Sequence, residues 1–252
     1  MPDYPEFKLL IDGEWRTTAE TIPVTNPSDE TIIGKMPVAR KNELDDALTA
    51  AANGLRIWSK TAPRQRCNII MRAAQIMRDN IEDIAYSNTL ELGKPINQSR
   101  LEVIRASETL EWDANEAQRL YGRVIPSTSG IRQTVLRQPI GIVAAFSAWN
   151  FPINQPARKI AAVLASGCSI ILKPAGDTPA GAFHIARAFQ AAGLPNGVLN
   201  LVFGDPDEIS RHLIADERTR LMAFTGSTSV GKHLGKLAAE HMKPVLMELG
   251  GH

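Results

Sequence analysis

The chain has 252 residues, of which 44% are hydrophobic and 22% charged, and its formal net charge is +1. Basic and acidic residues are interspersed, which excludes the single-sign patch that nucleic-acid binding needs. The longest apolar stretches, 140–149 and 161–172, are shorter than the roughly 18 residues that span a bilayer, so no membrane segment is predicted. The N-terminus lacks the features of a secretion signal and two cysteines make no disulfide framework, so we expect a cytoplasmic protein.

Residues 1–121 are predicted to form a strand hairpin followed by helices. Residues 7–39 have the pattern of strands and turns, and Asp12-Gly13 is a dipeptide that favours a type I′ hairpin. Residues 41–121 are predicted to be helical, because apolar residues such as Ile70, Ala74 and Met77 recur at helical spacing. We interpret residues 1–121 as the N-terminal hairpin and helical part of a larger domain.

Residues 122–139 are too polar and too short to form a core of their own. Apolar and polar residues alternate around Gln133 and Val135, which predicts a pair of strands that is marginally stable alone. Two interpretations stay open: a projecting arm that pairs with another subunit, or a surface hairpin folded back on its own domain. The first predicts a homo-oligomer, either a dimer or a tetramer.

Residues 140–252 alternate short apolar runs with helical segments. Continuous apolar runs are typical of strands buried on both faces, and alternating strands and helices predict parallel strands with right-handed crossovers. The fold class is therefore α/β, with a doubly wound, open, parallel, Rossmann-like sheet. The predicted strands are 140–146, 169–172, 199–203, 221–224 and 245–247.

The helices between these strands have readable ends. Thr178 is a candidate N-cap with Pro179 at the first helical position, and Gly193 closes the same helix. Asp205-Pro206 opens the next helix by the same combination of residues.

Four polar or glycine-rich segments follow predicted strands: Trp149-Asn150, Lys173-Pro174-Ala175-Gly176, Thr225-Gly226-Ser227-Thr228 and Glu248-Leu249-Gly250-Gly251. Successive strand ends converge at the carboxyl edge of a parallel sheet, where α/β proteins bind their ligands. The four segments therefore predict a cofactor site at that edge.

The segment from Gly226 to Gly231 follows a strand and opens a helix, so its backbone N–H groups can face a pyrophosphate. With Lys232 it also satisfies the G-x-x-x-x-G-K part of an NTPase phosphate loop, but His233 stands where that loop needs a serine or threonine for magnesium. A third interpretation is that the glycines only permit a tight turn.

Three side chains at this edge suit chemistry, and each also has a simpler explanation. Lys173 could bind ribose hydroxyls or a phosphate, or could be a lysine that extends to solvent. Asn150 could donate to an oxygen that gains charge during attack on a carbonyl, or could cap the following helix. Glu248, followed by two glycines, could act as a general base if partly buried, or could be merely the first polar residue after a strand.

The motifs Ser147-Ala-Trp-Asn-Phe-Pro152, Leu172-Lys-Pro-Ala175, Phe224-Thr-Gly-Ser-Thr228 and Glu248-Leu-Gly-Gly251 occur in this order. Together they resemble the NAD(P)-dependent aldehyde dehydrogenase superfamily, in its N-terminal, cofactor-binding portion. The resemblance covers essentially the whole chain and is greatest to the succinate-semialdehyde dehydrogenase group.

This resemblance implies a role for each motif. Asn150 would be the side-chain donor of the oxyanion hole, and Glu248 would activate the water that hydrolyses a thioester. Lys173 would contact the adenosine ribose or its phosphate, and Leu249 would approach the nicotinamide. The other implied cofactor contacts are Trp149, Pro174, Ala175, Gly176, Gly226, Ser227 and Gly231.

Two departures from the family pattern matter. The family's nucleophilic cysteine lies beyond the Glu-Leu-Gly-Gly segment, in a catalytic domain that we expect this chain to lack, and the apolar settings of Cys67 and Cys168 predict core residues. The chain alone is therefore expected to be inactive. Gly176 replaces an acid that NAD-preferring members often carry, which predicts that NADP is at least tolerated.

Two other functions stay open at this point, a P-loop-like nucleotide-binding protein and a non-catalytic assembly module of the same fold. No metal site is predicted, because His233 and His241 have no acidic or cysteine partner at ligand spacing. The aldehyde itself is not specified by any of these residues.

Overall fold

The computed structural model describes residues 3–251. Its centre is a seven-stranded sheet in the order β11-β10-β7-β8-β9-β1-β2. Five strands run parallel, as predicted: β7 (Ile142–Phe146), β8 (Ser169–Lys173), β9 (Leu199–Leu201), β10 (Thr219–Gly226) and β11 (Val245–Leu249). The N-terminal strands β1 (Leu9–Ile11) and β2 (Glu14–Arg16) extend the sheet in the antiparallel direction beside β9.

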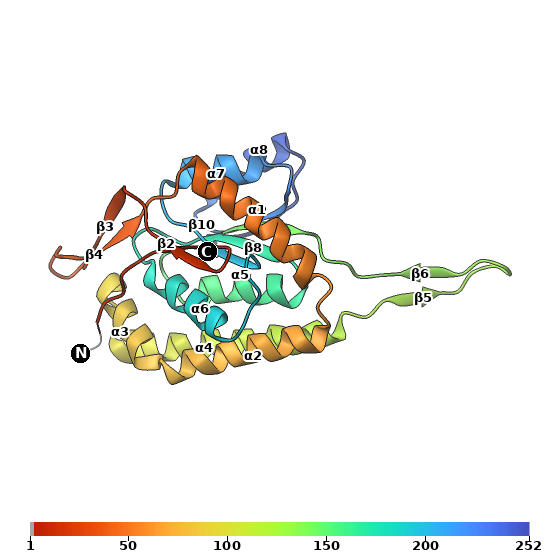
Figure 1. Ribbon diagram of the computed structural model, residues 1–252, viewed down its shortest axis with the longest axis horizontal. Helices are drawn as coiled ribbons and strands as arrows, with labels where there is room; N and C mark the ends of the chain where they lie inside the picture. Colours follow the sequence, from red (N-terminus) through yellow and green to blue (C-terminus); the bar gives the residue numbers. More distant parts are fainter. Residues whose placement is uncertain (1–2, 252) are drawn as a thin grey trace.

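Helices cover both faces of the sheet (Figure 1). On one face lie α1 (Lys41–Trp58), α7 (Pro206–Ala215) and α8 (Thr228–Glu240). On the other lie α5 (Asn154–Ala165) and α6 (Ala180–Ala191), and outside them a further layer of α2 (Pro63–Asp79), α3 (Ile81–Leu92) and α4 (Ile96–Glu116). A short 3-10 helix, η1 (Ala117–Arg119), ends this layer.

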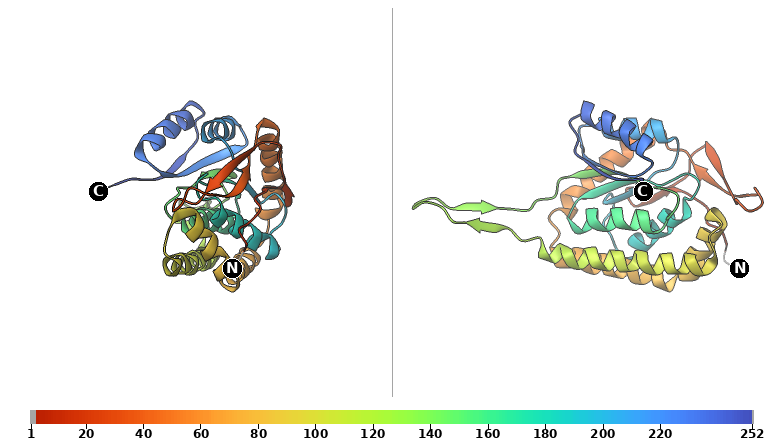
Figure 2. Two further views of the ribbon diagram at one scale, coloured as in Figure 1. Left: turned by 90° about the vertical axis from the view of Figure 1, so that its left-hand side faces the viewer. Right: turned by 180° about the vertical axis from the view of Figure 1, so that it is seen from behind.

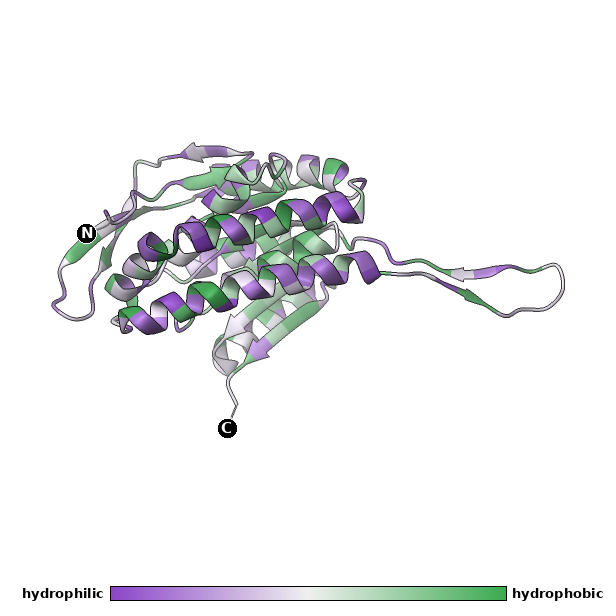
Figure 3. Ribbon diagram, turned by 90° about the horizontal axis from the view of Figure 1, so that it is seen from below, coloured by the Kyte–Doolittle hydropathy of each residue, from purple (hydrophilic) through white to green (hydrophobic). Residues whose placement is uncertain are grey.

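The outer helices are amphipathic, as their sequence spacing predicts. Hydrophilic and hydrophobic residues alternate along α2 and α4 when the molecule is seen from below (Figure 3). Their apolar residues, including Ile70, Met77 and Leu110, are fully buried against the inner helices. Cys67 and Cys168 are also buried, which confirms the core position predicted for both.

The predicted type I′ hairpin is present between β1 and β2. Asp12 and Gly13 have φ angles of 53° and 77°, and this turn type requires positive values at both positions. A second hairpin, β3 (Thr21–Thr25) with β4 (Ile32–Pro37), forms a separate two-stranded sheet at one end of the molecule.

Residues 122–139 project from the body as an arm (Figures 1 and 2). Its strands β5 (Arg123–Ile125) and β6 (Gln133–Val135) pair only with each other, and the large side chains of Val124 and Leu136 are 75% and 71% exposed. The alternative of a hairpin folded back on its own domain is therefore wrong. Pairing of the arm with another subunit stays a prediction.

The edge strand β11 differs from the expectation of strands buried on both faces. It pairs with β10 alone, and Val245 and Leu246 are 44% and 60% exposed. Helix α8 packs against one face, where Met247 and Leu249 lie close to its glycines. The opposite face, which carries Leu246 and Glu248, borders an open groove that residues of α4 and α5 also line.

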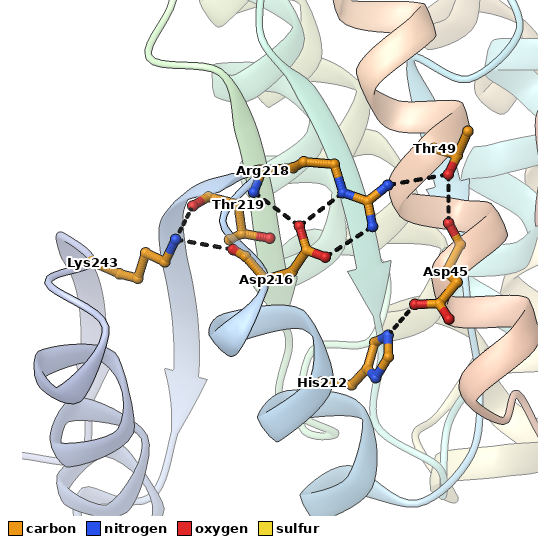
Figure 4. Close-up of polar contacts among 7 residues, drawn as sticks. All are labelled: Asp45, Thr49, His212, Asp216, Arg218, Thr219 and Lys243. Atoms are coloured by element: carbon orange, nitrogen blue, oxygen red, sulfur yellow. Dashed lines mark hydrogen bonds and ion pairs between the residues drawn. The ribbon is translucent and has the colours of Figure 1, made fainter.

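A polar cluster fixes the turn between α7 and β10 to its neighbours (Figure 4). Arg218 and Asp216 form a bidentate ion pair in this turn, and Lys243 donates to two backbone carbonyls of the same segment. His212 of α7 contacts Asp45 of α1 at 2.7 Å. The cluster thereby links α1, α7 and the turn before β11, on the face of the sheet away from the outer helices.

Helix α6 is capped differently from the prediction. It begins at Ala180, and the hydroxyl of Thr178 donates to the Trp149 carbonyl at 3.3 Å, so Thr178 is not its N-cap. The N–H of Ala180 instead donates to the carboxylate of Glu91 on α3, at 2.9 Å. The other predicted ends are confirmed, since Gly193 has a positive φ and Asp205 accepts a hydrogen bond from the first turn of α7.

None of the helices within residues 3–251 is long and apolar enough to cross a membrane. The cytoplasmic location stays a prediction from the sequence.

Burial of Glu91 makes the stability of the fold depend on pH. Desolvation raises the pKa of Glu91 to about 8 from an ordinary value of 4.5, although the Tyr4 hydroxyl and the Ala180 N–H favour its charged form. Between these two pH values the folded chain binds more protons than the unfolded chain. This contribution to the unfolding free energy is therefore complete below pH 4.5 and is lost as the pH rises through about 8.

We expect Glu91→Gln to flatten this dependence, because the amide keeps an acceptor for Ala180 but cannot ionise. The difference in slope between wild type and variant is at most about 1.4 kcal/mol per pH unit. Urea unfolding across the window measures it, with Glu116→Gln, a half-buried acid at the end of α4, as the control. Equal slopes for wild type and Glu91→Gln would contradict the prediction.

Candidate functional site

A cleft of about 860 Å³ lies at the carboxyl ends of β7, β8, β10 and β11. All four polar or glycine-rich segments predicted from the sequence contribute to its walls. The predicted site residues that line it are Trp149, Asn150, Lys173, Pro174, Ala175, Gly176, Gly226, Ser227, Glu248 and Leu249. Its volume is within the range of small-molecule and cofactor sites, and its position matches the ligand crevice of open α/β sheets.

Gly231 is the one predicted site residue that is not among those lining the cleft. It lies on α8, and a Cβ there would be 2.5 Å from the nearest side-chain atom of Leu249. Glycine at this position therefore lets α8 pack closely against β11, and contact of Gly231 with a cofactor stays a prediction.

The turn from β10 into α8 presents a helix N-terminus to the cleft. Ser227 is the N-cap, and its hydroxyl accepts a hydrogen bond from the Val230 N–H at 3.3 Å. Gly226 has no room for a side chain, since a Cβ would lie 2.4 Å from the Phe224 ring. Free N–H groups and the helix dipole at such a terminus favour an anion.

This turn is not an NTPase phosphate loop. The helix already begins at Thr228, so Thr228 to Lys232 are helical and no long loop remains to wrap a phosphate. His233 contacts Asp207 at 3.3 Å and occupies the position that the magnesium hydroxyl would need. Within residues 3–251 no three histidine, cysteine, aspartate or glutamate side chains gather as a metal site.

Lys173 is buried at the end of β8, with only 6% of the residue exposed. The alternative of a lysine extending to solvent is therefore wrong. Its Nζ donates to the Pro174 carbonyl at 2.9 Å, and burial lowers the pKa of Lys173 to about 8 against the opposing attraction of Asp205 and Asp177. Asp205 and Asp177 therefore place negative charge near the lysine. The glycine at position 176 carries no charge, so that position alone does not reveal them.

Asn150 lies on the segment between β7 and α5. Helix α5 has Ile153 at its N-cap and no local side-chain cap, so the alternative in which Asn150 caps this helix is wrong. Within the described part of the chain the Asn150 side chain has no hydrogen-bond partner, and it lines the cleft. Its amide is therefore free to donate to a ligand.

Glu248 lies between two polar partners at the end of β11. One carboxylate oxygen is 3.6 Å from the Arg158 guanidinium, and the other accepts from the Thr225 hydroxyl at 3.3 Å. The side chain is 48% exposed, so about half of it is buried. A carboxylate held in this way can accept a proton from water or a ligand in the cleft.

Lys159 is a component of the site that the sequence reasoning missed. It is 9% exposed, and its Nζ donates at 2.7 Å to the Thr225 hydroxyl, which in turn donates to Glu248. Burial lowers the pKa of Lys159 to about 8, while the charge of Glu248 opposes this shift. The sequence signal that could have revealed Lys159 is a charged residue, next to Ile160, on a helix face that is otherwise apolar.

A second groove of about 770 Å³ lies on the other side of Glu248, which is the only described residue that lines both openings. Residues from α4, α5 and β11 form this groove, and they include Arg105, Trp112, Arg158 and Leu246. Two ligands could thus approach Glu248 through separate openings.

Comparison with known proteins agrees with this arrangement. The sequence profile described as "Aldehyde dehydrogenase family" matches residues 15–252. The chain is 40% identical to a 4-(hydroxymethyl)benzenesulfonate dehydrogenase of Comamonas testosteroni and 37% identical to an NADP(+) succinate-semialdehyde dehydrogenase of Escherichia coli K12, in each case over 97% of this chain and 52% of the relative.

An aldehyde dehydrogenase structure from Brucella melitensis biovar abortus 2308 superposes with a TM-score of 0.97 at 38% sequence identity, covering 100% of this chain and 53% of the other. The chain thus spans about half the length of the curated relatives it matches. With a family profile that matches nearly all of its residues, the chain belongs to the aldehyde dehydrogenase family.

Proposed function

We propose that the chain is the cofactor-binding part of an NAD(P)-dependent aldehyde dehydrogenase, which oxidises an aldehyde to a carboxylic acid through a thioester. The convergence of Asn150, Lys173, Ser227 and Glu248 on one cleft is the observation that carries this proposal. Residues 1–121 form the hairpin and helical part of the cofactor domain, 122–139 the oligomerisation arm, and 140–252 the parallel core.

Two features of the cleft, the start of α8 and Lys173, suit the charged and polar groups of a nicotinamide dinucleotide. The N–H groups at the start of α8 would hold the pyrophosphate, and Lys173 would donate to the adenosine ribose or its 2′-phosphate. Trp149, Pro174, Ala175 and Gly176 would form the walls beside the ribose. The bound dinucleotide would supply the hydride acceptor, with its nicotinamide near Leu249.

The chain's own residues would stabilise charge and move protons. Asn150 would donate to the aldehyde oxygen as negative charge develops on it, which strengthens the hydrogen bond in the transition state. Glu248 would take a proton from the water that hydrolyses the thioester. Cys67 and Cys168 are buried, so the nucleophilic cysteine would come from outside the described residues, and the chain alone would not oxidise aldehydes.

The arm would pair with another subunit to make a homo-oligomer, a dimer or a tetramer. Its exposed apolar residues, which include Val124, Ile131 and Leu136, support this proposal because a solvated hairpin of this size gains little stability alone.

Two substitutions in the full-length protein test the catalytic assignment. We expect Asn150→Ala to slow the first hydride transfer by about 10²- to 10³-fold, as loss of one oxyanion donor does.

We expect Glu248→Gln to leave a burst of reduced cofactor but to slow later turnovers, because only thioester hydrolysis needs the base. Stopped-flow absorbance measures both phases, and Glu240→Gln, outside the cleft, is the control. A wild-type protein without aldehyde-dependent turnover would favour the non-catalytic assembly module instead.

The cofactor proposal is NAD or NADP, with NADP at least tolerated. We expect the two affinities of the full-length protein to differ by less than about a hundredfold, or 2.7 kcal/mol. We also expect Lys173→Met to weaken NADP binding more than NAD binding, because a cation beside the ribose attracts the additional phosphate. Fluorescence titration measures both, with the exposed Lys236→Met as the control. A larger preference for NAD would contradict this proposal.

The aldehyde proposed as substrate carries a negatively charged group, as a semialdehyde does. The two relatives described above are named for a sulfonate and for the semialdehyde of a dicarboxylic acid. In this chain Arg158 lies in the second groove beside Glu248, where it could pair with such a group. Glu108 and Asp113 also line the groove and add negative charge to it. The proposal therefore rests on the position of Arg158 and not on the net charge of the groove.

We expect Arg158→Leu in the full-length protein to raise KM for succinate semialdehyde by about tenfold or more, as loss of a charged hydrogen bond does. KM for an uncharged aldehyde of the same length should change much less. Arg119→Leu, an exposed arginine of η1, is the control. Equal effects on the charged and uncharged aldehydes would contradict an anion-binding role.

A further inference from the structure

The segment 147–153, here called the Asn150 turn, joins β7 to α5 and has no regular secondary structure. We propose that Glu102 of α4, acting with Lys94, is a positioning residue that holds this turn and thereby aims the Asn150 amide. The inference rests on the function proposed above for Asn150.

Glu102 fixes the end of the turn that enters α5. One of its carboxylate oxygens accepts from the backbone N–H groups of Ile153 and Asn154, at 2.9 and 3.1 Å. These are the first donors of α5, which has no cap from its own sequence. A carboxylate from another helix thus acts as the N-cap, and Glu102 is only 4% exposed.

The second carboxylate oxygen fixes the middle of the turn through Lys94. It accepts from the Asn88 amide at 3.3 Å and forms an ion pair with the Lys94 ammonium. Lys94 also reaches the Asn150 carbonyl at 3.4 Å and lies 4.4 Å from the centre of the Phe151 ring. Lys94 therefore joins the buried carboxylate to the backbone of Asn150 itself.

Two contacts from α6 and the segment before it complete the support. The Thr178 hydroxyl donates to the Trp149 carbonyl, and Gly181 leaves room for the Pro152 carbonyl, which would lie 2.2 Å from a Cβ at that position. The backbone of the turn is thus held from outside on either side of Asn150, whereas the Asn150 side chain has no partner among the described residues.

Such support matters because an oxyanion donor acts only at short range. Hydrogen bonds to the developing charge need donors at about 2.7–3.1 Å, and a displacement of about 1 Å can lower a rate about 10²-fold. Loss of the Glu102 contacts should therefore slow chemistry much more than it weakens cofactor binding, for which the proposed polar contacts lie at Lys173 and the start of α8.

The test uses the full-length enzyme with Glu102→Gln in two backgrounds, wild type and Asn150→Ala. The amide can still accept a backbone N–H, but its NH₂ group cannot accept from Lys94. In the wild-type background we expect the rate of hydride transfer in a single turnover to fall about 10- to 100-fold, with a much smaller change in the Kd for the cofactor. In the Asn150→Ala background the same substitution should change the rate by less than about threefold, because the two residues act as one unit.

Equal losses in both backgrounds would overturn the inference and leave the role of Asn150 intact. An Asn150→Ala variant with wild-type hydride transfer would overturn the proposed role of Asn150 and this inference with it. Glu116→Gln, at the end of the same helix, is the matched control and should change neither rate.

Two further measurements guard against a folding defect. Amide hydrogen exchange should become faster in Glu102→Gln for the peptide that contains Ile153 and Asn154, because a neutral amide oxygen is a weaker acceptor than a carboxylate, and should stay unchanged in β8. Unchanged exchange in that peptide would overturn the inference. If Glu102→Gln does not fold, Lys94→Met keeps the cap and removes the contact to Asn150, and it should show the same dependence on the Asn150 background.

Discussion

Two buried glutamates connect the outer helical layer to the edge of the sheet where the cleft lies. Glu91 of α3 accepts from the first N–H of α6, and Glu102 of α4 accepts from the first two N–H groups of α5. A buried carboxylate is destabilising unless several donors satisfy it, and helix N-termini supply such donors together with a favourable dipole. The strand-to-helix turns after β7 and β8 thus depend on contacts from helices that precede the parallel strands in the chain.

The local parts of this architecture could be predicted from the sequence. Asp12-Gly13 specifies its turn because the backbone there needs two positive φ angles, and continuous apolar runs specify the five parallel strands. The convergence of the cleft residues followed from the direction of those strands, since the carboxyl ends of parallel strands meet at one edge.

The parts that could not be predicted are contacts between distant residues. Glu102 and Ile153 are 51 positions apart, and Glu91 and Ala180 are 89 apart, so no periodicity or capping motif reveals either pair. For the same reason Thr178 looked like a cap although its hydroxyl contacts Trp149, and Lys159 was overlooked. The sequence also could not decide whether residues 122–139 project or fold back on their own domain, because these residues form no core with the domain.

The exposed edge of β11 has a consequence for how the purified chain should behave. An unpaired strand edge with an apolar side chain such as Leu246 beside it is a template on which a further strand can add. Self-association through that edge depends on the protein concentration, because two molecules must meet. Dilution rather than cooling would then keep the chain monomeric, and a charged residue in place of Val245 or Leu246 would improve its solubility.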